Sequence, residues 1–172
     1  MGKINTNSLD KMQMLLSQAD VYARNRKCAT IANEIADIQK SPVCAIELND
    51  GHLISGKTSS LLRCSSAALL NALKYLAGID QEIQLISPNM LKSILSLKND
   101  YLNIANPLLD IDEVLLTLSI ASAQDENASQ CLKALPLLKN CEIHSTVILS
   151  KKDTATLRKL HMNLTCDPKY PA

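Results

Sequence analysis

The sequence predicts an α/β fold, in which a five-stranded mixed sheet with flanking helices follows a helical extension. Short β-branched apolar runs alternate with longer segments in which apolar residues recur every three or four positions. An Asp-Gly pair between two of the runs predicts an antiparallel hairpin, and a strand, short helix and strand near the end predict a parallel pair. The sheet is therefore mixed. We divide the chain into a helical extension over residues 1–40 and an α/β domain over residues 41–172.

Two stretches of the extension carry apolar residues at helical spacing. The first runs from Leu9 to Ala19 and the second from Cys28 to Ile38, and the spacing leaves open whether they form one helix or two. Asp20 is a candidate N-cap for a second helix. Pro42 ends the stretch, because the residue before a proline avoids helical backbone angles.

A hairpin opens the α/β domain. We expect strands at Val43–Leu48 and His52–Ser55, joined by Asn49-Asp50-Gly51. Asp-Gly between apolar runs favours a type I′ turn, in which both central residues have positive φ. Gly56 is expected to end the second strand.

A long helix is predicted over residues 58–77, with Thr58, Ser59 or Ser60 as its cap. Its apolar spacing places Leu69 and Leu73 on the buried face. Gly78 followed by Ile79 is typical of a Schellman stop.

The second half of the domain alternates strands and helices. We expect strands at 82–86, 143–149 and 162–165, and helices that start at Ser87-Pro88, at Asp110, after Asn127 and at Ser150. Asp110 with Glu113 forms a capping box, which accounts for these carboxylates and for Asp112 without a catalytic role. The last two strands and the helix between them predict a parallel β-α-β unit.

Composition excludes several function classes. There are 18 Lys and Arg residues against 17 Asp and Glu, which argues against nucleic acid as a partner. Four Tyr are the only aromatic residues, so a base-stacking surface is not expected. No apolar run is long enough for a membrane helix or a signal peptide, and we expect no membrane partner. Six separated cysteines in apolar patterns indicate buried free thiols and a cytoplasmic protein.

Residues Gly51–Thr58 match the phosphate-loop pattern G-x4-G-K-[ST]. The four residues between the glycines resemble a strand and not a loop around phosphate, so we favour a hairpin followed by a capped helix. A weaker version remains, in which a helix start with a lysine and unpaired amides binds an anion. We expect such a site at Gly56, Lys57, Thr58 and Ser59.

Cys141, His144 and Cys166 have a spacing that suggests metal binding. Structural zinc needs four ligands, and a fourth residue cannot be assigned. We therefore predict no metal and no cofactor, and expect buried thiols and a core histidine. His144 and Cys166 remain neighbours of a site if the domain has one.

Several strings together resemble a known family. The likeness covers roughly residues 20–170 and lies in Ala45–Gly51, Ser55–Ser60, Leu69–Leu73, Leu76–Ile79, Leu85–Pro88, Asp112–Val114, Asn140–Ser145, Val147–Ser150 and Asn163–Cys166. They are similar to the C-terminal part of the bacterial uncharacterised protein family 0371, also called domain of unknown function 1846.

The resemblance implies a cytidine-deaminase-like topology and a parent protein about three times longer, with a glycine-rich N-terminal part that is not matched here. Arg63-Cys64 stands where the family has small residues, and His161 where a glycine is expected. The family is uncharacterised, so the resemblance implies no activity. It implies no deaminase site either, because the zinc pattern of deaminases, H-x-E or C-x-E with P-C-x-x-C, is absent.

Two functions remain open. The first is a binding or assembly module of a larger protein, without complete catalytic machinery, whose partner is the N-terminal part of the parent or a second copy. The second is a fragment of a phosphate- or nucleotide-handling enzyme, with the anion site at the start of helix 58–77. The sequence does not decide whether the chain is an enzyme.

Overall fold

A computed structural model describes residues 6–20, 22, 25–104 and 107–170. In this part of the chain the sheet has four strands in the order β2-β1-β3-β4. β1 (Val43–Glu47) is antiparallel to β2 (Leu53–Lys57) and to β3 (Glu142–Ser145). β3 is parallel to β4 (Asn163–Cys166). The predicted mixed sheet is confirmed, but the prediction of a fifth strand is wrong.

The sequence predicts a fifth strand at residues 82–86, but these residues form turns. Ile83 donates its backbone N–H to the carbonyl of Asp80, and Glu82 donates to the Asp80 carboxylate. Leu85 and Ile86 are buried in the main core. A short apolar run can enter a core without pairing with a strand, and periodicity alone does not separate the two cases.

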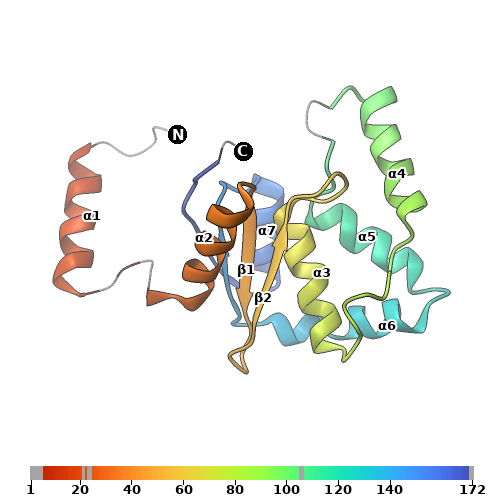
Figure 1. The fold of residues 1–172 in the computed structure, drawn as a ribbon, viewed down its shortest axis with the longest axis horizontal. Helices are drawn as coiled ribbons and strands as arrows, with labels where there is room; N and C mark the ends of the chain where they lie inside the picture. Colours follow the sequence, from red (N-terminus) through yellow and green to blue (C-terminus); the bar gives the residue numbers. More distant parts are fainter. Residues whose placement is uncertain (1–5, 21, 23–24, 105–106, 171–172) are drawn as a thin grey trace.

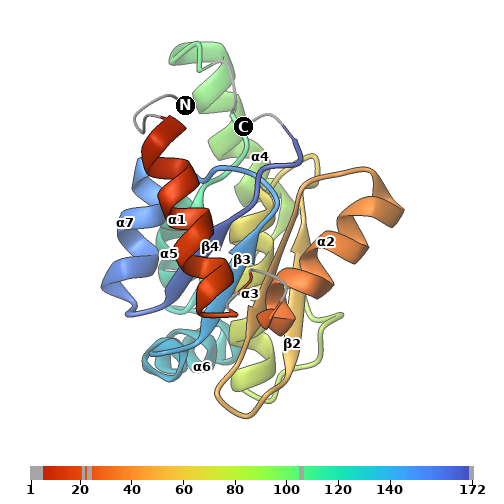
Figure 2. The same ribbon diagram turned by 90° about the vertical axis from the view of Figure 1, so that its left-hand side faces the viewer.

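Helices cover both faces of the sheet (Figure 1). One face is covered by α2 (Lys27–Gln39), with Tyr170 packed against the same cluster. The other face packs against the main core, to which α3 (Cys64–Leu76), α5 (Ile111–Ala121), α6 (Glu126–Lys133) and α7 (Lys151–Lys159) contribute. Figure 2 shows α2 and α7 on opposite sides of the strands. The remaining elements are α1 (Thr6–Gln18), α4 (Pro88–Ser96), the π-helical turn η2 (Leu97–Tyr101) and the 3₁₀ turn η3 (Leu135–Leu138).

The alternation of β1 divides the core between the two faces. Cys44 and Ile46 belong to the main core, and Val43 and Ala45 pack against α2. Leu69 and Leu73 of α3 are fully buried, as predicted. α3 ends in the predicted Schellman motif, because Ile79 donates to the carbonyl of Lys74 and Gly78 donates to that of Tyr75.

Two boundaries near Gly56 differ from the prediction. β2 continues through Gly56 to Lys57, and α3 begins at Cys64, not at residues 58–60. Gly56 is a contact residue, since a Cβ built on it would lie 2.1 Å from the backbone nitrogen of Ala68. The glycine lets α3 pack directly against β2, so it belongs inside a strand and does not end one.

Several local signals hold in the structure. Asp110 and Glu113 form both hydrogen bonds of the capping box of α5, and Ser87 caps α4 with Pro88 at its start. The hairpin turn has positive φ at Gly51 only, so it is not type I′. His161 has a φ of 56°, a left-handed conformation that glycine adopts without strain, which explains why a glycine was expected there.

Candidate functional site

A cavity of about 90 Å³ lies where α3 and α7 begin. Arg63, Cys64 and Ser65 of the α3 start line one side of it, and Ser150 and Asp153 of the α7 start line another. The remaining lining residues come from the loops next to the sheet and include Pro42, Thr58, Leu108, Val147, Ile148 and Leu149. It therefore combines the first turns of two helices with the segment that follows β3.

Asp153 connects the starts of three helices. Its carboxylate accepts hydrogen bonds from the Ser65 hydroxyl (3.1 Å) on α3 and from the Ile111 backbone N–H (2.9 Å) on α5. The Ser150 hydroxyl caps α7 by accepting from the Asp153 N–H at 3.0 Å. Burial raises the pKa of Asp153 above 3.8, and the bonds from Ile111 and Ser65 act in the opposite direction. The α5 start is thus already neutralised by a protein carboxylate.

The starts of α3 and α7 place positive partial charges beside the cavity. The first amides of a helix have no partner within the helix and carry a partial positive charge. Arg63 adds a guanidinium group, whose Nε donates to the Leu108 carbonyl at 3.4 Å. Hydroxyls of Thr58, Ser65 and Ser150 supply further polar groups among the lining residues.

Cys64 is an unfavourable nucleophile in this cavity. The residue is buried, and burial raises the pKa of its thiol above 9.0, although the Thr58 and Ser145 hydroxyls act in the opposite direction. The thiol is therefore protonated at neutral pH, whereas the thiolate is the reactive form. The geometry supports binding better than covalent chemistry.

The four residues predicted to bind an anion do not all line the cavity. Gly56 and Lys57 are in β2, and only Thr58 lines the cavity. The Thr58 N–H donates to the Pro42 carbonyl, and the Ser59 N–H donates to that of Leu62. These two amides already have partners, and the helix start that motivated the prediction lies at Cys64. An anion site at residues 56–59 stays a prediction.

His144 and Cys166 are not brought together. His144 is opposite Ala45 and Thr165 in the sheet register, whereas Cys166 is opposite Ser145. Successive strand residues point to opposite faces, so His144 faces α2 and Cys166 faces the other side. Cys141 precedes β3, and its thiol donates to the Leu137 carbonyl at 3.6 Å. All six thiols are free, but the prediction that they are buried is wrong for Cys166, which is exposed. No group of three or more His, Cys, Asp or Glu residues in the described ranges is arranged to hold a metal.

His144 forms part of a polar network beneath α2. Its Nδ1 lies 2.8 Å from the Thr165 hydroxyl, which also accepts a hydrogen bond from Arg26. Arg26 pairs with Glu142 as well and donates to the Asn163 carbonyl at 2.8 Å. Burial and the Arg26 charge lower the pKa of His144, so the ring is neutral at pH 7. Its Nε2 is buried and has no partner in the described part of the structure.

Only weak signals in the sequence point to the cavity. The sequence predicts a helix start at Ser150, and Asp153 follows it at the third helical position. The sequence marks Arg63 only as a departure from the family and does not mark Ser65, because the predicted start of α3 lies several residues too early. With α3 beginning at Cys64, residues 63–65 line the same cavity as Ser150 and Asp153.

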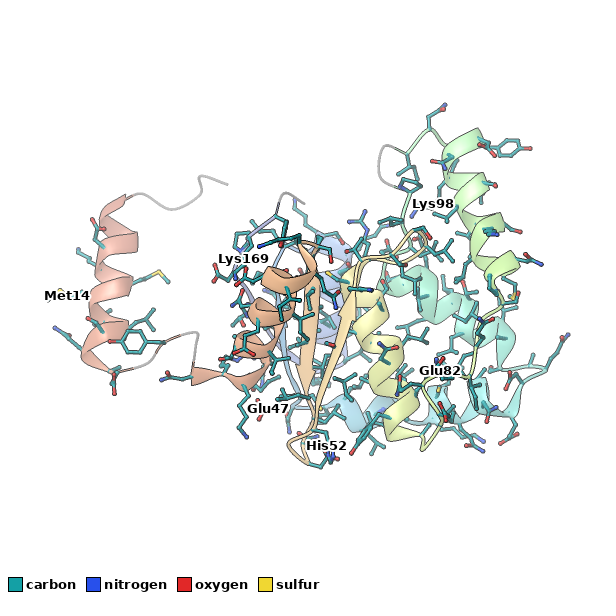
Figure 3. All side chains as sticks on the ribbon, viewed as in Figure 1. Met14, Glu47, His52, Glu82, Lys98 and Lys169 are labelled. Carbon is teal, nitrogen blue, oxygen red and sulfur yellow. The ribbon has the colours of Figure 1, made fainter. Side chains whose placement is uncertain are left out.

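Helix α1 presents exposed apolar side chains. It stands apart from the sheet (Figure 1). Met12, Leu15 and Leu16 recur at helical spacing and are all exposed. Met14 points away from the rest of the domain (Figure 3). Helical geometry places Met12 and Leu16 on the opposite side of α1 and Leu15 about 100° from Met14. We call Met12, Leu15 and Leu16 the α1 apolar face.

Comparison with known proteins assigns the chain to a family. Residues 24–172 match the family described as domain of unknown function DUF1846, C-terminal. The chain belongs to this family. The match includes α2 and the whole sheet, with every residue of the cavity. Among the described residues, no helix is long and apolar enough to cross a bilayer.

Curated relatives of the chain are called UPF0371 proteins. One from Corynebacterium diphtheriae is 43% identical over 169 residues, which are 98% of this chain and 34% of that protein. One from Corynebacterium aurimucosum is 41% identical over 97% of this chain and 34% of the relative. One from Clostridium botulinum is 38% identical over 99% of this chain and 36% of the relative. The chain spans about a third of the length of these proteins.

Proposed function

We propose that this chain is the assembly domain of a longer UPF0371 protein, and that its partner is the N-terminal region found in the relatives. The observation that carries the proposal is the α1 apolar face, which leaves Met12, Leu15 and Leu16 exposed. Burying one such side chain stabilises a contact by about 1.5–3 kcal/mol. Exposed apolar patches of this kind mark interaction sites.

The length of the relatives supports the choice of partner. The chain covers 34% of the Corynebacterium diphtheriae protein, and the family match describes this portion as C-terminal. α1 precedes the matched residues 24–172, so it lies on the side of the domain that connects to an N-terminal region. We also propose that the domain has a cytidine-deaminase-like topology. The strand order β2-β1-β3-β4 supports this topology.

Charge substitution on α1 tests the assembly function. The chain is co-expressed with the N-terminal region of the Corynebacterium diphtheriae relative, and the complex is measured by affinity capture and light scattering. Leu15→Glu combined with Leu16→Glu is expected to weaken binding at least about a hundredfold, because it buries two carboxylates in an apolar contact.

Met14→Glu is the matched control. Met14 is 61% exposed and Leu15 is 64% exposed, but Met14 lies outside the α1 apolar face. Its substitution should leave binding nearly unchanged. Absence of a complex with the unsubstituted chain would refute the proposal. A dimer of this chain that the double variant disrupts would show that a second copy, and not the N-terminal region, covers the face.

The cavity at the starts of α3 and α7 favours a second candidate, the binding of a small phosphate-like anion. The supporting observation is that Arg63 and two helix starts line the same cavity. Titration of the chain with inorganic phosphate, followed by amide shifts, should perturb residues 63–66 and 150–153. Arg63→Ala should abolish the shifts and Lys57→Ala should not. The reverse result would favour the site predicted at residues 56–59, and no shifts would remove both.

A further inference from the structure

We propose that the outer edge of β4 pairs with an extended strand from the same N-terminal region, and that an acidic side chain of that strand binds Arg158. The inference rests on the proposed assembly function and names a second contact for it. Its observations are independent of α1, since they concern the opposite end of the chain.

The backbone of β4 has one unpaired side. Among the residues that the structure describes, β4 is the last strand of the sheet and pairs only with β3. Asn163 donates its N–H to the Cys141 carbonyl, and Asp167 donates to that of Ser145, so these residues point toward β3. The alternation of a strand then turns the N–H and C=O groups of Leu164 and Cys166 outward. This is the template for strand addition.

The two edges of the sheet differ in protection. Natural edge strands are commonly blocked by lysine, proline, a bulge or a covering side chain. At the β2 edge, the Asn71 amide donates to the Ser55 carbonyl at 2.9 Å, and exposed Lys57 ends the strand. The sequence of β4, Asn-Leu-Thr-Cys, contains no charge and no proline, and three of its four residues are exposed. The β4 edge is therefore the one suited to a partner.

A groove beside β4 contains the positive charge that would bind an acidic side chain of the incoming strand. It has a volume of about 480 Å³, and Arg26 and Arg158 both line it. Arg26 is already held by Glu142, Thr165 and the Asn163 carbonyl. Arg158 has no side-chain hydrogen bond or ion pair within the described residues, and its guanidinium is available for a bidentate carboxylate. An incoming strand would thus place an acidic residue next to α7.

The length of the relatives supports the choice of occupant. Two thirds of the Corynebacterium diphtheriae protein lies outside the part that this chain matches. A strand from that region would extend the four-stranded sheet and cover the exposed backbone of β4. A second copy of this chain is the competing occupant, and it would give a dimer joined at β4.

Charge reversal tests the contact with Arg158. Binding of the co-expressed N-terminal region is compared for the unsubstituted chain, Arg158→Glu and Lys159→Glu. Arg158→Glu is expected to weaken binding about tenfold or more, because it replaces an ion pair with repulsion. Lys159→Glu makes the same charge change one residue away and outside the groove, and it should alter binding by less than about twofold.

Backbone substitution tests the pairing itself. Cys166→Pro removes an outward N–H without removing a bond to β3, and proline is tolerated on such an edge. It should weaken binding about tenfold, whereas Cys166→Ser should not. In the complex, hydrogen exchange at Leu164 and Cys166 should slow. An unchanged affinity in both Arg158→Glu and Cys166→Pro would overturn the edge contact, as would a dimer joined at β4. If the α1 double variant still abolished binding, the assembly function would stand without it.

Discussion

Replacement of Gly56 by alanine is expected to lower the free energy of unfolding by more than about 4 kcal/mol, which is a large part of the stability of a domain of this size. The added Cβ would lie 2.1 Å from the Ala68 nitrogen and 2.6 Å from the Ala67 carbonyl carbon. These are backbone atoms of α3, so only a shift of the whole helix relieves the overlap. Urea unfolding followed by circular dichroism measures the effect.

Gly51→Ala is the control for this substitution. Gly51 has a φ of 86°, and no atom lies within 4 Å of the position that a Cβ would take, so alanine there meets strain without overlap. We expect a cost of about 1–2 kcal/mol. Equal costs at the two positions would show that α3 does not lie against β2 as described.

Asp153→Ala is expected to destabilise the chain by about 4 kcal/mol. Asp153 is 1% exposed, and its loss leaves the Ser65 hydroxyl and the Ile111 amide without their acceptor in a buried place. The starts of α3, α5 and α7 lose their common contact at the same time. Chemical unfolding monitored by far-ultraviolet circular dichroism gives the free energy of unfolding.

Asp153→Asn separates the hydrogen bonds from the charge. The amide keeps one acceptor and cannot ionise, so we expect a smaller loss than for alanine. Burial raises the pKa of Asp153 above 3.8. The stabilisation that comes from this raised pKa is therefore fully present below pH 3.8 and is lost as the pH rises through the folded-state pKa. The difference in the free energy of unfolding between the unsubstituted protein and the asparagine variant should therefore shift in favour of the variant as the pH rises from about 4 to about 7. A constant difference over this range would contradict a raised pKa.

Patterns that act within a few residues were reliable guides to the fold. The capping box of Asp110 and Glu113, the Ser87-Pro88 helix start and the Gly78-Ile79 stop all form as predicted. Each depends on hydrogen bonds between near neighbours in the chain, which composition and spacing determine directly. The parallel β3–β4 pair was also predicted, because a short helix between two strands permits that connection.

The candidate cavity was predicted only in part. The sequence predicts Thr58 as an anion contact but not Arg63 or Ser65. The reason is that the hydroxyl residues at 58–60 are of the types that cap helices, so the predicted helix start lies before the observed start at Cys64. Ser59 instead stabilises a turn, where its hydroxyl accepts from the amides of Leu61 and Leu62. A serine can serve a turn or a helix cap equally well, so the choice depends on what packs around it.

The sequence by itself determined the α/β class, the hairpin, the caps of α4, α5 and α7, and the family, because these follow from periodicity, local hydrogen bonding and shared sequence segments. The features that depend on packing between distant parts of the chain were decided only by the tertiary structure. Gly56 continues a strand because α3 lies against it, Leu85 and Ile86 enter the core without pairing, and His144 and Cys166 face opposite sides of the sheet. These outcomes depend on contacts between residues far apart in the chain, which no local pattern encodes.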